Sequence, residues 1–489
     1  MNDLITVINN LIWSKALIAL CLGAGLYFSI RTRFMQVRSM PEMLRAIFSG
    51  GKSAAGVSSF QALTMSLSGR VGTGNIAGVA TAIAFGGPGA VFWMWVVAFF
   101  GASTAYVEAT LAQIYKEKDD KGLYRGGPAY YIEKGLGLKW YAWLFALATV
   151  MATGFLLPGV QANSIGSAME SAWGIDPGIT AACIIVSLGF IIFGGVKRIA
   201  RFAEIVVPIM ALTYMVIGTV VMATNLGQVA VIGSLIFKSA FGLQAGFGAV
   251  LGLAVEWGVK RGVYSNEAGQ GTAPHPAAAA EVSHPAKQGY VQAFSVYVDT
   301  MLVCSMTAFL ILSSGTYNVI NPAGGMLVEH LPGVEIGPGY TQAAVEAVFP
   351  GFGQGFVALA LLFFAFTTIV AYYYMAETNI AFVNRKVQRP WMTLALRIGI
   401  LLMVGFGTIR TAAAAWQLGD IGVGLMAWLN IVAILILQKP ALLALRDYER
   451  QRRAGQEPQF DPEALGIRRA DFWVTRLKAS RSTDQTDQS

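Results

Sequence analysis

The sequence predicts an all-α integral membrane protein that crosses the bilayer with 11 transmembrane helices. Three observations support this fold class: an apolar composition, a series of long apolar runs, and positive charge concentrated in loops on one side. Hydrophobic residues make up 55% of the 489 residues and charged residues only 13%, about half the charged share of a soluble globular domain. Such a chain has too little polar surface for a soluble enzyme, and its composition also excludes a disordered chain.

Eleven apolar stretches are long enough to be transmembrane helices, since a helix needs roughly 20 apolar residues to span the hydrocarbon core. The predicted spans are 11–30, 58–84, 89–115, 139–160, 177–195, 202–224, 246–273, 287–314, 353–380, 391–409 and 415–437. The stretch 226–243 is also apolar, but glycines and Lys238 interrupt it. We therefore interpret it as an interfacial segment.

The Lys and Arg residues predict the orientation of these spans. Loops 31–52 and 116–139 hold five and six of them, and ten more lie from Lys439 onwards, whereas loop 315–350 has none. Because cytoplasmic loops carry the excess of positive charge, we expect the amino terminus outside the cell and the carboxyl terminus in the cytoplasm, with the protein in the cell membrane. The formal net charge of +8 therefore follows from membrane topology and does not indicate a nucleic-acid partner.

An internal repeat is present at an offset of 191 residues. The matched pairs that carry most weight are Arg70 and Arg261, Asn75 and Asn266, Thr81 and Thr272, and Tyr106 and Tyr297. The offset covers five predicted helices, which is an odd number, so the second copy would enter the membrane from the opposite side. Inverted repeats of this kind are typical of secondary transporters.

This repeat divides the chain into four regions. Residues 1–57 hold the first transmembrane helix and a cytoplasmic loop, and 58–224 hold the first five-helix repeat. Residues 225–437 hold the second, inverted repeat with the interfacial segment, and 438–489 form a cytoplasmic tail. The first helix therefore stands outside the symmetry.

Both copies of the repeat begin in a segment that is unsuited to a continuous helix. Four glycines lie among the eleven residues 68–78, and the corresponding segment 258–269 combines glycine with Lys260, Arg261 and Glu267. Each glycine in a helix interior costs about 1 kcal/mol relative to alanine. Irregular backbone at membrane depth persists only where it lines a cavity or is buried in protein, so two such breaks predict a substrate site near the middle of the membrane.

Two other interpretations of these glycines exist. The segment from Gly72 to Ala77 fits the dinucleotide-binding fingerprint, but no strand precedes it, as that fingerprint requires. Gly74 and Gly78 have the spacing of small residues that allow transmembrane helices to pack closely. The arginine and asparagine that recur in both halves favour a binding site over helix packing alone.

No residue set for catalysis or for a transition metal is evident in the sequence. Cys21, Cys183 and Cys304 each lie inside an apolar stretch, and the three histidines are scattered over predicted loops. Metal sites and nucleophile–base pairs need such residues close together. We therefore expect neither an enzyme nor an organic cofactor.

Five sequence blocks resemble the alanine or glycine:cation symporter family. The longest is the segment from Gly87 to Gly101, and the shorter ones are 72–78, 125–128, 161–163 and 265–269. The resemblance implies a fold of the leucine-transporter type, in which one extra helix precedes a 5+5 inverted repeat. It also implies sodium-driven uptake of alanine or glycine, with Na+ as the coupling ion and the lipid bilayer as the surroundings. No obligatory protein partner is expected.

The resemblance further assigns residues to the substrate site. Thr73, Gly74 and Asn75 in the broken second span would contact the carboxylate and ammonium groups of the amino acid, and Gln161 would add a polar contact from the fourth span. The implied substrate residues are Thr73, Gly74, Asn75, Gln161, Ser265, Asn266, Thr368 and Tyr372. This chain has Ala371-Tyr372 where the family pattern has Gly-Trp, so the wall of the pocket has a different shape.

For the sodium ion, the resemblance implies four ligands. They are the hydroxyls of Thr367 and Thr368 and the backbone carbonyls of Ser68 and Val71. Hard oxygen ligands of this kind suit a group-one cation.

Charged residues at membrane depth leave alternatives open. Glu256 and Lys260 are spaced i, i+4 and could pair on one helix face. Such buried charges either form structural ion pairs, which we favour, or take part in gating or proton transfer. The same fold driven by protons through Glu267 or Asp299 is therefore the main alternative. A non-transporting channel or nutrient sensor is a further one, although the predicted tail is short for the output domain of a sensor.

Overall fold

The computed structural model describes residues 2–486 apart from 52, 244–246, 248–249, 388, 390 and 410–411. The described chain is almost entirely helical. Its strands form two short antiparallel hairpins, β1 (Glu117–Lys118) with β2 (Tyr124–Arg125), and β3 (Asn318–Ile320) with β4 (Met326–Glu329).

Eight helical segments in the described part of the chain are long and apolar enough to cross a membrane. They are Leu4–Arg31, Gly89–Ile114, Lys139–Trp173, Gly195–Thr224, Pro285–Ser314, Gly353–Val387, Trp391–Ile409 and Ala415–Arg453. These segments coincide with eight of the eleven predicted spans. The other three predicted spans, 58–84, 177–195 and 246–273, are shorter or broken helices, which places the irregular backbone in both halves of the chain.

The first predicted break lies inside the span 58–84. The helix α5 (Ser59–Arg70) begins with a capping box, in which Ser58 Oγ accepts a hydrogen bond from the backbone of Gln61 and the Gln61 side chain accepts one from the backbone of Ser58. It ends where Val71 leaves helical geometry, at φ −78° and ψ 87°. A π-helical turn, η1 (Gly74–Gly78), and the helix α6 (Val79–Gly86) follow.

The second predicted break lies inside the span 246–273. The helix α14 (Leu251–Asn266) ends at Glu267, whose φ of 56° is left-handed. Gly269 and Gly271 follow with φ of +81° and +85°, a conformation that glycine adopts without steric cost. The short helix α15 (Pro274–Ala279) then completes the segment. The first predicted break is thus confirmed. The second lies only at the end of its predicted segment 258–269, because residues 258–266 belong to α14. Neither span forms a single straight helix.

The remaining helices follow in chain order. Before the first break lie α1 (Asn2–Ile12), α2 (Lys15–Arg31), α3 (Met35–Arg38) and α4 (Met40–Ile47). Between the breaks lie α7 (Gly89–Ile114), α8 (Pro128–Tyr131), η2 (Ile132–Leu136), α9 (Lys139–Met151), η3 (Ala152–Leu156), α10 (Leu157–Trp173), α11 (Pro177–Ile192), α12 (Gly195–Thr224) and α13 (Leu226–Ala240). After the second break lie α16 (Pro285–Val296), η5 (Tyr297–Cys304), α17 (Ser305–Ser314), α18 (Pro338–Val348), α19 (Gly353–Val387), α20 (Trp391–Ile409), α21 (Ala412–Arg453) and α22 (Asp471–Thr486).

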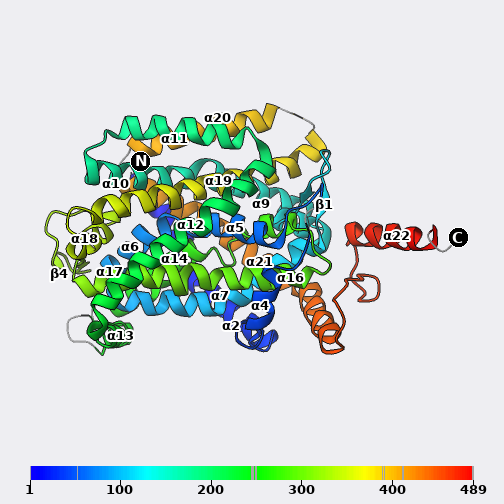
Figure 1. The fold of residues 1–489 in the computed structure, drawn as a ribbon, viewed down its shortest axis with the longest axis horizontal. Coiled ribbons are helices and arrows are strands. Elements are labelled where there is room, and N and C mark those ends of the chain that lie inside the picture. The colour runs from blue at the N-terminus through cyan, green and yellow to red at the C-terminus, as the bar shows by residue number, and fades with distance from the viewer. Residues whose placement is uncertain are drawn as a thin grey trace.

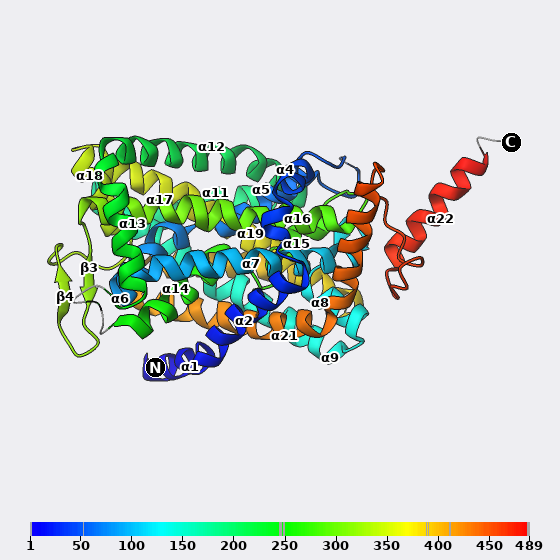
Figure 2. The same cartoon turned by 90° about the horizontal axis from the view of Figure 1, so that it is seen from below.

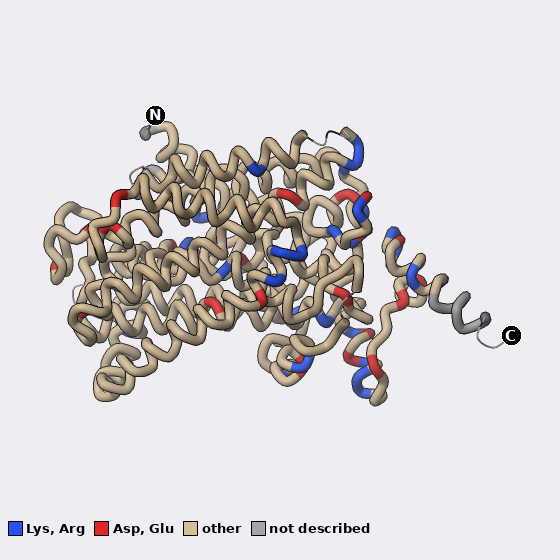
Figure 3. The backbone as a smooth tube through the Cα atoms, turned by 45° about the horizontal axis from the view of Figure 1, so that its top comes forward, with Lys and Arg blue, Asp and Glu red and all other residues tan. Residues whose placement is uncertain are grey.

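The long helices run along the long axis of the molecule and form one bundle (Figure 1 and Figure 2). The helices α7 and α19 are enclosed, since 67% and 72% of an apolar stretch of each helix is buried. For α12 and α20 the buried share is 28%, and these helices form the periphery. The helix α18 and the β3–β4 hairpin lie at one end of the bundle. The β1–β2 hairpin, α4 and α22 lie at the other, which we call the tail end, and Figure 3 shows Lys and Arg gathered there.

The last predicted span does not stop where the apolar stretch stops. The helix α21 continues to Arg453, so the predicted domain boundary at 438 lies inside a helix. Pro440 is tolerated within this helix. Figure 2 shows that the last part of this helix turns sharply away from the direction of the bundle helices, as a proline inside a helix favours.

Candidate substrate and sodium site

Gly72 lies at the point where the first break meets two other helices. A Cβ atom at this position would overlap the hydroxyl oxygen of Thr368 in α19 and would lie 3.1 Å from Oε1 of Gln161 in α10. Only glycine allows this close approach. The broken backbone of 71–74 is therefore held directly against α10 and α19.

Gln161 closes one side of this contact. Its Oε1 accepts a hydrogen bond from the backbone N–H of Thr73 at 3.0 Å. Its side chain also interacts with Tyr372 of α19. The hydroxyl of Thr73 is buried and has no hydrogen-bond partner. The backbone N–H of Thr73 is thus paired with the Gln161 side chain, whereas the Thr73 hydroxyl is buried and unpaired.

Asn75 and Ser265 meet at the carboxylate of Asp299 in η5. Asn75 Nδ2 donates to Asp299 Oδ1 at 2.6 Å, and Ser265 Oγ lies 3.1 Å from the same oxygen. The other oxygen of this carboxylate accepts a hydrogen bond from Thr300 at 2.6 Å. All of these side chains are buried. The carboxylate, which belongs to the second half of the chain, is therefore held by residues from both breaks.

Gly74 and Asn266 determine how the two breaks fit together. A Cβ on Gly74 would lie 3.1 Å from the Cα of Ser265, so η1 and α14 approach backbone to backbone. Asn266 Oδ1 accepts a hydrogen bond from the N–H of Ala268 at 3.0 Å. Asn266 thus holds the left-handed end of α14, while its repeat mate Asn75 reaches Asp299.

The implied sodium ligands are only partly brought together. The hydroxyl of Thr368 donates to the carbonyl of Ser68 at 2.7 Å, across the contact between α5 and α19. Val71 ends α5, where the last carbonyls have no intrahelical donor. The hydroxyl of Thr367 instead donates to Phe364 O at 2.9 Å and lies 3.7 Å from Met210 Sδ of α12. Ser68, Val71 and Thr368 share one location, and Thr367 faces the neighbouring helix.

No transition-metal cluster accompanies this oxygen-rich location. Among the described residues, no group of three or more His, Cys, Asp or Glu is placed to hold a metal ion. The side chains near the first break are mainly amides and hydroxyls, with the Asp299 carboxylate, the Cys304 thiol 3.3 Å from Asn75 Nδ2, and the Glu267 carboxylate close to Gly69. They can bind a zwitterion and a hard monovalent cation.

The two repeat-related arginines have different surroundings. Arg261 Nη2 and Lys260 Nζ both contact Oδ2 of Asp420 in α21, at 2.7 and 2.8 Å. The ion pair of Lys260 is therefore made with Asp420 across the bundle, and the expected pairing with Glu256 along α14 is not the contact that it makes. Arg70 donates to the carbonyl of Gln292, and its Nε and Nη2 are buried without hydrogen-bond partners.

Two buried glutamates lie behind the second break. Glu108 of α7 accepts hydrogen bonds from the N–H of Gly269 at 3.3 Å and from Asn430 Nδ2 at 2.7 Å. Glu267 accepts one from Thr272 at 2.9 Å, while its Oε1 has no partner. Glu108 thus holds the loop after α14, which is a structural role for one of the buried charges.

Sequence reasoning missed the contacts of Asp299 and the role of Asp420. Asp299 aligns with Glu108 in the repeat, and that alignment was the available signal for an acidic residue near each break. Asp420 had no such signal, because it lies in α21 and reaches its partners across the bundle. Its pairing depends on tertiary packing.

Comparison with known proteins places these features in a family. The model of the sodium:alanine symporter family matches residues 1–462. A putative sodium/proton-dependent alanine carrier protein of Bacillus subtilis (strain 168) is 61% identical over 473 residues, covering 97% of this chain and 98% of the relative. A sodium/proton-dependent alanine carrier protein of Bacillus sp. (strain PS3) is 54% identical, covering 89% and 98%. A sodium/alanine symporter of Methanococcus maripaludis is 37% identical, covering 89% and 94%.

Proposed function

The chain belongs to the sodium:alanine symporter family, and we propose that it imports alanine or a similarly small neutral amino acid together with Na+ by alternating access. It is a membrane transporter and not an enzyme. The proposal includes 11 transmembrane helices, with residues 58–224 and 225–437 as inverted repeats of the leucine-transporter type. The names of the relatives, which specify alanine with sodium or with sodium and protons, support this substrate and this coupling.

The single observation that carries the proposal is the convergence of both broken segments on one location. Thr73 of the first break pairs with Gln161, and Asn75 and Ser265 from the two breaks share Asp299. Freed backbone N–H groups at a half-helix start favour an anionic group. The substrate carboxylate would therefore take the N–H groups of Thr73 and Gly74, with Gln161 turning to donate to it.

The substrate ammonium would lie toward the buried acidic group. The carboxylate of Asp299 is the negative charge beside Asn75 and Ser265. Backbone N–H groups would thus face the substrate carboxylate, and Asp299 would face the substrate ammonium. This arrangement suits a zwitterion. Gly72 and Gly74 are in close contact with Thr368, Gln161 and Ser265, so the surrounding helices, together with Tyr372, limit the space for a side chain. This arrangement favours alanine or glycine over larger amino acids.

Sodium would bind where α5 ends against α19. The Ser68 carbonyl and the Thr368 hydroxyl already contact each other at 2.7 Å. The Val71 carbonyl lies three residues farther along the chain. A cation entering between them would replace this hydrogen bond with two ligand bonds. Thr367 would have to rotate away from Met210 to become a further ligand. An ion bound here joins the two repeats, since α5 and α19 belong to different halves.

Proton coupling is the second candidate, because two of the relatives are named sodium/proton-dependent. Asp299 accepts hydrogen bonds from three side chains, which favours its charged form. Glu267 has one carboxyl oxygen that is buried without a donor, and a buried charge without partners is costly. Of the two residues, Glu267 is therefore the better proton carrier.

We also propose that the tail end faces the cytoplasm. The gathering of Lys and Arg at that end supports this orientation (Figure 3). The amino terminus would then lie outside the cell, and the protein would lie in the cell membrane. Labelling of a cysteine introduced at Lys478, in intact cells and in inside-out vesicles, tests the orientation: modification only in inside-out vesicles is expected, and modification in intact cells would contradict it.

The site assignment is tested with two threonine variants of the same type. Thr368 and Thr213 each donate a hydrogen bond to the carbonyl four residues earlier, but Thr213 is exposed on the outside of α12. We expect Thr368→Ala to weaken the apparent Na+ affinity for alanine uptake into proteoliposomes about tenfold. Thr213→Ala should leave it unchanged. Equal Na+ affinities in the wild type and Thr368→Ala would overturn the sodium site.

A further inference from the structure

The chain beyond α21 contacts the tail end of the bundle through the first turns of α22, and the rest of this helix extends away from the bundle (Figure 1 and Figure 2). We call residues 456–479 the C-terminal strap. The family model ends at residue 462, so the helix α22 lies beyond the part of the chain that the family defines. Although α22 is polar in composition, the side chain of Trp473 is only 2% exposed. A tryptophan buried in a polar tail indicates a specific docking contact.

The first anchor of the strap lies at the end of α7. Trp473 Nε1 donates to the carbonyl of Gln113 at 2.8 Å. Beside it the ammonium of Lys116, which is fully buried, lies 4.3 Å from the ring centroid of Tyr124 and 4.7 Å from that of Phe472. Cation–π contacts of this kind gain strength when water is excluded. The strap thus supplies one wall of an aromatic enclosure around a lysine of the bundle.

The second anchor lies in the loop between α15 and α16. Arg476 Nη1 contacts Glu281 Oε1 at 2.7 Å and donates to the carbonyl of Val282 at 3.0 Å. Ser283 contacts the strap through its hydroxyl and its carbonyl. The hydroxyl donates to Pro458 O at 2.8 Å, and the carbonyl accepts from the N–H of Phe460 at 3.1 Å. An ion pair between Lys287 and Glu457 adds to these contacts.

The two anchors belong to different halves of the chain. Gln113 and Lys116 lie in the first half, whereas residues 281–287 lie in the second. A third contact, from Arg469 Nη1 to the carbonyl of Lys134 at 3.3 Å, reaches the segment before α9. The strap therefore ties elements of both halves together at one end of the bundle.

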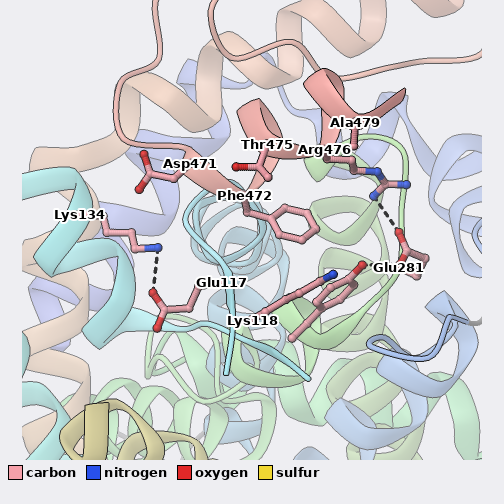
Figure 4. A pocket seen from close by; sticks show the side chains of 10 residues that line it. Glu117, Lys118, Lys134, Glu281, Asp471, Phe472, Thr475, Arg476 and Ala479 are labelled. Atoms are coloured by element: carbon pink, nitrogen blue, oxygen red, sulfur yellow. Dashed lines mark hydrogen bonds and ion pairs between the residues drawn. The ribbon is translucent and has the colours of Figure 1, made fainter. Parts of the chain in front are cut away.

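The seam between the strap and the bundle is not closed. A cavity of about 550 Å3 lies between α22 and the β1–β2 hairpin. Figure 4 shows that charged side chains line it, with the Arg476–Glu281 pair on one side and the Lys134–Glu117 pair on the other. Surface ion pairs of this type are individually weak. Detachment of the strap would break these ion pairs and would expose the buried side chains of Trp473 and Lys116.

We propose that the C-terminal strap is an autoinhibitory latch that restrains opening of the transporter at the tail end. This inference rests on the proposed transport by alternating access, in which the two repeats move relative to each other. The helices α7 and α16 pack against each other. Docked, the strap ties this pair to η2 through the contact of Arg469 with Lys134, and so slows the opening. Released, it allows faster cycling.

Charge reversal in the full-length chain tests the latch. Arg476→Glu places two acidic groups opposite each other at Glu281, so we expect the strap to detach and the initial rate of alanine uptake to rise about fivefold, the lower range of couplings between sites. The double variant Arg476→Glu/Glu281→Arg restores the pair and should return the rate to the wild-type value. Lys478→Glu, on the exposed side of the same helix, is the matched control and should have no effect.

A second measurement does not depend on transport. Ala200 is buried and lines a cavity of about 560 Å3 at the tail end beside α5. In a Cys183→Ser background, a cysteine at Ala200 should react faster with a water-soluble maleimide in Arg476→Glu than in the parent, and in Trp473→Ala as well. Wild-type chain that shows no alanine uptake would refute the proposed function, while this labelling still tests the strap.

The outcomes separate clearly. Faster uptake and faster labelling in Arg476→Glu, both reversed by the double variant, support the latch. Unchanged uptake and labelling in Arg476→Glu and Trp473→Ala would overturn it, as would a slower uptake at equal protein amounts, because a strap that is needed for activity is not inhibitory.

Discussion

The two helix breaks occupy corresponding places in the repeat but have different surroundings. At the first break, α5 stops at Arg70 and the backbone turns against α10 and α19, with Gly72 in direct contact with Thr368 and Gln161. At the second, α14 continues through Arg261 and stops only at Asn266. The first break leaves the Thr73 hydroxyl without a hydrogen-bond partner and brings the Thr368 hydroxyl against the Ser68 carbonyl. The second supplies Ser265 from an otherwise intact helix.

The arginines Arg70 and Arg261 show the same difference in their charges. Arg261 is fixed by Asp420 and lies over the rings of Trp416, Trp257 and Tyr264, at 4.6, 5.2 and 5.5 Å. Arg70 donates to two neutral acceptors on α16, the carbonyl of Gln292 and the hydroxyl of Ser295. Each of the two arginines leaves two of its nitrogens without a hydrogen-bond partner. Arg261 thus has an acidic partner on α21, whereas Arg70 has neutral partners on α16, so the repeat-related arginines hold their helices by different contacts.

The largest effect is expected where the second half is fixed. Asp420→Asn leaves Lys260 and Arg261 without a counter-charge, and removing one partner of a buried pair costs about 3–5 kcal/mol. We expect a marked loss of thermal stability in detergent. Glu256→Gln, one turn from Lys260, is the control and should change stability by less than about 1 kcal/mol. Similar stability of both variants would show that Asp420 is not the residue that fixes this half.

The next largest effect is expected at the first break. Gly72→Ala forces Thr368 and Gln161 apart, and displacement of this order costs about 100-fold in rate at a site that depends on geometry. Gly78→Ala, in the same segment, should be tolerated, because its nearest neighbours lie 3.9 Å from the added Cβ. Alanine uptake measured at equal protein amounts distinguishes them. If Gly72→Ala transports normally, the first break does not form the site.

The repeat mates Asn75 and Asn266 allow the smallest but most direct comparison. Asn75→Ala removes the hydrogen bonds of this side chain to the Asp299 carboxylate and from the Gly72 N–H, and we expect about tenfold weaker substrate binding together with a loss of about 1 kcal/mol of stability. Asn266→Ala removes a hydrogen bond that caps α14 and should cost about 1 kcal/mol of stability with unchanged affinity. Binding is measured by isothermal calorimetry in sodium buffer. The reversed pattern would mean that the second break contains the ligand site.

The sequence predicted those features that depend on local composition. The glycine-rich segment 68–78 located the first break, because a run of glycines disfavours a helix wherever it occurs. The segment 258–269 located only the end of α14, since Arg261 lies inside that helix. The sequence did not reveal the Lys260–Asp420 pair, since residues 260 and 420 are brought together only by packing of α14 against α21. The docking of Trp473 and the orientation of the Thr367 side chain toward α12 were hidden for the same reason.

The most direct test of the account is uptake of radiolabelled alanine into proteoliposomes that contain the purified wild-type chain. An inward sodium gradient is compared with potassium combined with an inward proton gradient. We predict accumulation that requires sodium and is competed by glycine but not by leucine. Uptake that is equally fast without sodium would contradict the ion site at Ser68 and Thr368, and no uptake under either gradient would contradict alanine as the substrate.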